Sequence, residues 1–253
     1  AAAAAGAATA IGALTTKAIE GYAAQEQLVG GVETLFKTSS DTVVGYANDA
    51  YKTAGMSANE YMETVTSFSA SLLASMNNDT AAAAEKANVA ITDMSDNANK
   101  MGTDISLIQN AYNGFAKQNY TMLDNLKLGY GGTKEEMQRL LDDASKLSGI
   151  KYDISSYSDV VDAIHVVQTE MGITGTTAKE ASTTIEGSVS SMSSAWDNWV
   201  AGMADSEANF SQLTSNLVDS IVTVVGNIAP RVIETVPRLV SGLGEIVEQL
   251  ATY

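Results

Sequence analysis

The sequence predicts an all-α protein in which short helix hairpins are followed by long amphipathic helices, arranged in an oligomeric coiled-coil-like bundle. Apolar residues recur at intervals of three and four along most of the chain, and no stretch shows sustained alternation. Only two prolines occur in 253 residues, whereas turns rich in Gly, Asn and Ser separate the apolar stripes. Ten methionines suit adaptable packing between helices.

The first 25 residues are rich in Ala and Gly, and we expect one helix of small side chains at the end of a preceding segment. Neither end resembles a natural terminus, so we expect a piece of a longer protein. Residues 1–16 carry no charge, but Ala is too weakly apolar for a convincing membrane span. Close packing of this helix against a neighbour is the preferred interpretation.

Residues 26–175 are predicted to form a helical core domain. Gly55 and Gly149 have the position of left-handed helix caps, and Ser57–Glu60 and Thr133–Glu136 match the capping box that opens a helix. The segment from Tyr120 to Leu128 is apolar and is predicted to be buried. The apolar stripes predict helices over 43–54, 61–76, 87–101, 105–115, 137–147 and 157–171.

Residues 176–253 are predicted to form long helices with an apolar face that serves as an interface. From Phe210 onward one stripe continues for about forty residues, and Pro230 and Pro237 should kink or divide the helix. We expect the stripe to bind other copies of the chain, with a trimer favoured. The predicted oligomer interface comprises Leu217, Ile221, Val224, Ile228, Leu239, Leu243, Ile246 and Leu250.

Composition argues against several functional classes. Thirty acidic and 14 basic residues give a net charge of −16, which disfavours stable nucleic-acid binding. Without Cys there is no disulfide, thiolate metal site or Cys nucleophile, and a single His excludes a multi-histidine metal site. We therefore predict no enzyme activity, no catalytic residue, no cofactor and no metal.

Three motifs come nearest to a chemical function, and each has a simpler structural interpretation. His165 has Asp162 three residues away but no reacting partner, so we interpret it as an ordinary residue on a helix face. Gly129–Lys134 only loosely resembles a phosphate loop, because Thr133 and Lys134 are reversed. Asp93–Asp104 loosely resembles a calcium-binding loop, but it lacks the turn glycine and the final Glu of such a loop.

Five blocks of sequence, in consistent order, resemble the core region of phage tail tape measure proteins, specifically those of siphophages or prophages of Gram-positive hosts. The resemblance covers roughly residues 26–200. The blocks are Glu26–Phe36 (EQLVGGVETLF), Ala50–Met62 (AYKTAGMSANEYM), Ile91–Gly102 (ITDMSDNANKMG), Gln118–Gly132 (QNYTMLDNLKLGYGG) and Met171–Ser182 (MGITGTTAKEAS).

This resemblance implies a structural protein of a long non-contractile tail. Such a protein lies in the tail tube as a few helical copies, sets tail length during assembly and leaves at genome ejection. Its implied partners are the tail tube and the tail-tip or baseplate proteins. Its implied locations are the virion's tail lumen, the host cytoplasm during assembly and the host membrane on infection. The alternative is a membrane-active helical protein that forms a channel for DNA passage.

Overall fold

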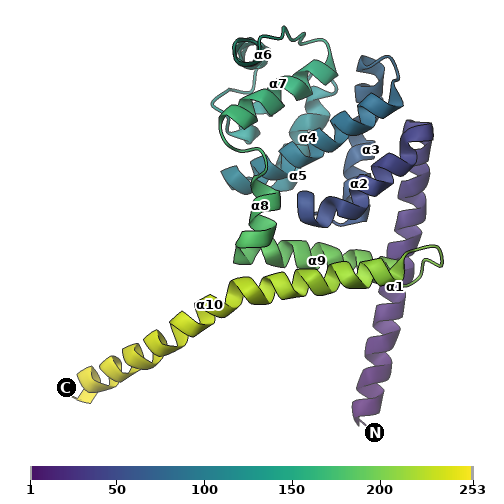
Figure 1. Ribbon diagram of the computed structural model, residues 1–253. Helices are drawn as coiled ribbons and strands as arrows, with labels where there is room; N and C mark the ends of the chain where they lie inside the picture. Colours follow the sequence, from purple (N-terminus) through teal and green to yellow (C-terminus); the bar gives the residue numbers. More distant parts are fainter. Residues whose placement is uncertain (1, 252–253) are drawn as a thin grey trace.

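The computed structural model describes the backbone of residues 2–251, and the side chains of residues 12–235 together with Pro237 and Arg238. The chain is 80% helical, and residues 2–251 contain no strand, which confirms the all-α prediction. Figure 1 shows a helical body from which the first and last helices project. The helices are α1 (Ala2–Phe36), α2 (Ser40–Thr53), α3 (Ala58–Ser75), α4 (Thr80–Met101), α5 (Ile105–Phe115), α6 (Lys134–Ser148), α7 (Tyr157–Glu170), α8 (Thr176–Thr183), α9 (Ile185–Gly202) and α10 (Phe210–Ala251), with 3₁₀ turns η1 (Lys37–Ser39) and η2 (Leu123–Leu126).

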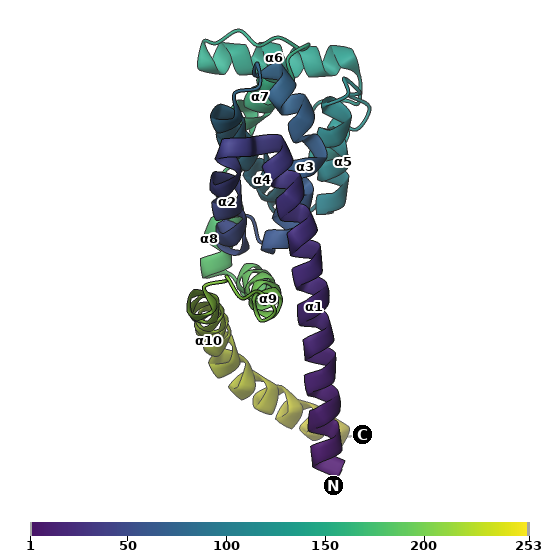
Figure 2. The same ribbon diagram turned by 90° about the vertical axis from the view of Figure 1, so that its right-hand side faces the viewer.

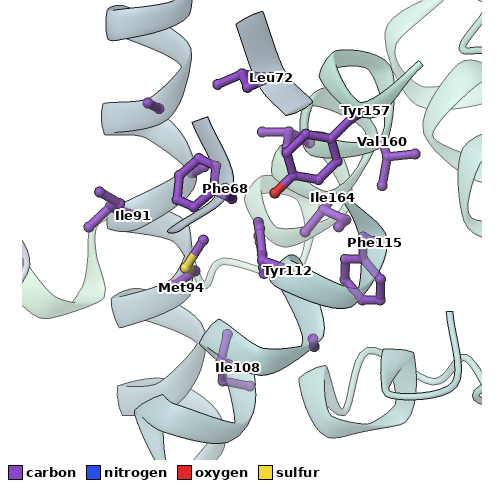
Figure 3. Packing of buried hydrophobic residues seen from close by; sticks show 14 of the residues in the cluster. Phe68, Leu72, Ile91, Met94, Ile108, Tyr112, Phe115, Tyr157, Val160 and Ile164 are labelled. Carbon is purple, nitrogen blue, oxygen red and sulfur yellow. The ribbon is translucent and has the colours of Figure 1, made fainter. Parts of the chain in front are cut away.

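The body is organised around α4, which contacts α1, α2, α3, α5, α7 and α8. One face of α4 is largely alanine, including the fully buried Ala83, Ala87 and Ala90, so neighbouring helices can approach closely. Aromatic rings from α3, α5 and α7 fill the space beside it (Figure 3), and Phe68 meets Tyr157 edge to face with ring centroids 6.2 Å apart. These contacts make one continuous core between Val32 and Ile173.

Local sequence signals account for the helix ends. Ser57 and Glu60 form the expected capping box at the start of α3, and Gly149 ends α6 with φ +75°. The second predicted capping box is only half formed. Thr133 accepts a hydrogen bond from the Glu136 amide, but the Glu136 carboxylate accepts from the Gly131 amide and pairs with Arg139 instead.

Helices α8, α9 and α10 pack against one end of the body. Figure 1 shows α9 and α10 side by side in opposite directions, with α1 crossing α9. A Cβ atom on Gly21 of α1 would lie only 3.2 Å from Cβ of Ala201 on α9, so small residues permit this crossing. Helix α1 is continuous across residue 25, where the sequence division had been placed.

The last helix follows its predicted course, and of the two outcomes expected at its prolines, a kink or a division, the division does not occur. It begins at Phe210 and runs for 42 residues, as the continuous stripe indicated. Pro230 and Pro237 lie inside it without dividing it, and Figure 2 shows a helix that curves as it leaves the body. A bend that relieves the clash of each proline ring with the preceding turn is sufficient to keep the helix intact.

Candidate functional site: the apolar face of the last helix

Part of the predicted interface is covered within the chain by α9. Leu217 and Val224 are each only 8% exposed, and Leu217 packs with Ala195 of α9 and Tyr51 of α2. Trp199 Nε1 donates to Thr214 Oγ1 at 3.1 Å, which links the same two helices. This side of α10 is therefore an intramolecular contact as well as part of the predicted stripe.

The remaining predicted interface residues differ in exposure. Ile221 is 44% exposed and Ile228 is half-buried. The side chains of Leu239, Leu243, Ile246 and Leu250 lie outside the described residues. The sequence analysis did not predict that α9 would cover α10. The signal was present, because Met192, Ala195 and Trp199 are spaced by three and four and so form an apolar face on α9.

A second face of α10 remains uncovered. Its apolar side chains are between 44% and 73% exposed, and no charged residue occurs between Asp219 and Arg231. Patches of this kind on soluble proteins mark contacts with other proteins or with membranes. The uncovered face comprises Val218, Ile221, Val222, Val225, Val232 and Ile233.

The same helix is the one described helix long and apolar enough to cross a membrane. The span Phe210–Thr235 has 26 residues; an 18-residue window within it has a mean hydropathy of 1.2, and only 17% of that window is buried. Length and composition alone underlie this assignment.

His165 has an unexpected partner. Its Nδ1 lies 2.9 Å from Oδ2 of Asp93, whose side chain is 1% exposed, whereas Asp162 pairs with Lys86. Burial raises the pKa of Asp93, and the hydrogen bond to Asp93 raises the pKa of His165. The neighbour in sequence, Asp162, is therefore not the partner of His165; α4 contributes that partner, Asp93, from 72 positions away.

Asp96, one turn beyond Asp93, fixes the start of α8. Its buried carboxylate accepts hydrogen bonds from the Gly175 amide at 2.6 Å and the Thr177 amide at 2.7 Å. Asp93 and Asp96 lie in the segment that loosely resembles a calcium-binding loop. Both carboxylates are instead bound by other parts of the chain, Asp93 by His165 and Asp96 by the start of α8. Among the residues whose side chains are described, no group of three acidic, His or Cys residues is placed to hold a metal ion.

Comparison with known proteins does not assign a family. The chain matches no protein-family model, and no curated protein sequence or solved structure matches it significantly. The functional argument therefore depends on the sequence blocks and on the exposed face of α10.

Proposed function

We propose that this chain is part of a phage tail tape measure protein, a structural component inside the tube of a long non-contractile tail. The five ordered sequence blocks support this assignment. The structural observation that carries it is α10, a 42-residue helix that leaves the body with an apolar face uncovered. At 1.5 Å per residue it extends about 63 Å, and such a helix converts a number of residues into a length.

The charge of the chain suits a tube through which DNA later passes. With a net charge of −16, the chain should repel the phosphate backbone rather than retain it. In this proposal the protein contacts the tail tube and the tail-tip or baseplate proteins, sets tail length during assembly, and leaves when the genome is ejected.

Insertions into α10 test directly whether the length of the chain sets the length of the tail. In the gene that encodes the chain, in-frame insertions of 14, 28 and 56 helix-forming residues after Glu234 should lengthen the tail by about 1.5 Å per residue. Tail lengths are measured on virions by electron microscopy. Insertion of equally long flexible Gly-Ser segments provides the control, because they have no fixed rise. If virions carrying the helix-forming insertions have normal tails of unchanged length, the chain does not set tail length.

Self-association is part of the same proposal. Covering the exposed half of the six apolar side chains on the second face of α10 is worth on the order of 5–9 kcal/mol. Other copies of the chain, with a trimer favoured, would supply this cover in a narrow tube. The four predicted residues between Leu239 and Leu250 continue along the same helix.

Analytical ultracentrifugation tests this association. Joint substitution of Leu239, Leu243 and Ile246 by Asp should abolish the oligomer, as should joint substitution of Val222 and Val225. The control places Asp at Ser211 and Ser215, which are exposed positions on the same helix. An oligomer that survives both apolar variants would refute the assigned interface.

The second candidate is a membrane-active protein that forms a channel. The exposed apolar stretch Phe210–Thr235, which carries no charge between Asp219 and Arg231, favours it. Dye release from liposomes by the whole chain measures this activity. Efficient release that is lost when Val222 and Val225 are changed to Asp would favour the channel, whereas an oligomer without release would favour the tape measure role.

A further inference from the structure

Helix α9 carries an apolar stripe that is only partly covered in the folded chain. Its members recur at alternating intervals of four and three residues, which is the spacing of a coiled coil. Met192 and Trp199 pack in the contact with α10. Ile185, Val189 and Trp196 are between 40% and 43% exposed, so this part of the stripe remains in water.

The same register continues through the connection into α10. Counting on from α9 in steps of four and three gives Met203, Ser206, Phe210, Leu213 and Leu217. Of the ten positions in this register from Ile185 to Leu217, Ser206 alone is polar. Two helices that merely fold back on each other need no common register, whereas one continuous helix keeps its apolar residues on one face. The sequence of this region therefore has the pattern of a single helix.

The connection between α9 and α10 contains nothing that forbids a helix. Residues 203–209 include no Gly or Pro, and none of them has a positive φ. By contrast, each connection from α1 to α8 contains a residue with positive φ, such as Gly102 with φ +60° and Gly149 with φ +75°. Met203 still has helical angles, φ −64° and ψ −30°. The backbone of α9 can therefore continue into α10 without strain.

Local hydrogen bonds of two polar side chains hold the bend. The carboxylate of Asp205 accepts from the Glu207 amide at 2.9 Å. The side-chain oxygen of Asn209 accepts from the Gln212 amide at 3.1 Å, at the start of α10. Asp and Asn side chains that bond to nearby amides in this way offer the backbone an alternative to the helix. The bend is thus a local preference, which a competing interaction can overcome.

We propose that α9 and α10 straighten into one helix, Ile185–Ala251, when copies of the chain associate in parallel through this stripe. Straightening depends on the self-association proposed above and adds the conformation in which the copies meet. A second copy is the occupant that the register specifies, because alternating intervals of four and three residues match helices with the same repeat. A lipid surface places no such constraint on the spacing. The exposed Ile185, Val189 and Trp196 then become interface residues.

Association replaces the contacts that the hairpin loses. Straightening separates Trp199 from Phe210, whose ring centroids are 5.5 Å apart, and Leu217 from Ala195. In a parallel bundle the stripe residues meet their counterparts on neighbouring copies. The straight helix would be about 100 Å long at 1.5 Å per residue, compared with about 63 Å for α10 alone. The change therefore lengthens the helical rod without adding a residue.

The distance between two spin labels tests the proposal on the whole chain, which has no native Cys. Ser193→Cys and Ser215→Cys provide exposed attachment points on α9 and α10. In the hairpin these positions lie on neighbouring helices, whose axes pack about 8–10 Å apart, whereas one straight helix separates them by about 33 Å. In a concentration series with unlabelled chain in excess, the distance should change from the short to the long value as sedimentation shows the oligomer to form. Labels at Glu85→Cys and Glu135→Cys, in the body, should keep one distance throughout.

A covalent lock provides a complementary test. A short bifunctional maleimide that joins Cys side chains placed at Ser193 and Ser215, applied at low concentration, fixes the hairpin. The locked chain should associate at least tenfold more weakly. The matched control is the same variant treated with a monofunctional maleimide, which should associate like the parent chain.

Removal of the bonds at the bend should have the opposite effect. Asp205→Ala with Asn209→Ala should populate the long distance at a concentration at least threefold lower than the parent chain requires. The control, Ser206→Ala with Ser211→Ala, raises helix propensity in the same segment without removing either bond. It should shift that concentration less than twofold.

The outcomes separate straightening from association. An oligomer in which the distance between positions 193 and 215 stays short overturns the straightening and leaves self-association intact. A chain that is monomeric at every concentration overturns both. Unimpaired association of the locked hairpin, or an Asp205 and Asn209 variant that behaves like its control, contradicts the straightening as well. Circular dichroism verifies that each variant is folded.

Discussion

The contact between Asp96 and the start of α8 allows a sharp test of how the C-terminal helices are held. Helix α8 has Gly175 at its N-cap, with φ +83° and no side-chain cap of its own. The carboxylate of Asp96, contributed by α4, accepts from the amides of Gly175 and Thr177 instead. Asp96→Asn keeps the volume of the side chain but replaces one acceptor oxygen by an NH₂ group that faces a backbone N–H.

The expected loss of stability follows from these two bonds. Each hydrogen bond to a buried charged group contributes about 1.5–3 kcal/mol, and Asn retains one neutral bond worth about 1 kcal/mol. Relief of the desolvation cost of the carboxylate offsets part of the loss. The free energy of unfolding should therefore fall by about 2–4 kcal/mol, a large share of the 5–15 kcal/mol typical of a folded domain.

Urea denaturation followed by circular dichroism measures the loss, and hydrogen exchange locates it. Peptides that cover residues 173–184 should exchange faster in Asp96→Asn, while those from α6 stay protected. The control Asp124→Asn changes an exposed carboxylate and should stay within about 0.5 kcal/mol of the parent. An Asp96→Asn variant with parental stability and unchanged exchange at α8 would refute the assigned role of this carboxylate.

Three further predictions concern charge and packing. The pKa of Asp93 is raised above 3.8 and that of His165 above 6.5, so the folded chain retains protons that the unfolded chain has released. The free energy of unfolding should therefore fall as the pH rises through the folded-state pKa values of these two groups. Asp93→Asn should make this fall smaller when urea denaturation is repeated at a series of pH values. Gly187→Ala should lower the free energy of unfolding by about 1–3 kcal/mol, because the new Cβ would lie 2.5 Å from the Glu180 carbonyl carbon. Gly226→Ala, which has open space around it, should raise the free energy of unfolding by about 0.5–1 kcal/mol, and thermal unfolding measures both changes. In a gel-shift assay at physiological salt the chain should not retain duplex DNA, and tight, salt-sensitive binding would contradict the electrostatic argument.

The positions of α2 to α7 and of α10 could be predicted from the sequence, because the signals that set them are local, whereas the division of residues 176–202 into α8 and α9 was not predicted. The spacing of Tyr61, Phe68 and Leu72 marks one face of α3, and Ser57 caps its start within three residues. The same reasoning located the beginning of α10 at Phe210 and the buried segment around Leu123 and Leu126.

Which surfaces meet was decided only by the tertiary structure. The bond between Asp93 and His165 joins residues 72 positions apart, and Asp96 reaches the α8 amides across 79 and 81 positions. Periodicity shows that α10 has an apolar face but not that α9 covers Leu217 while Val222 stays exposed. Helical spacing is a property of consecutive residues, whereas the partner of each face depends on how all the helices fill one core.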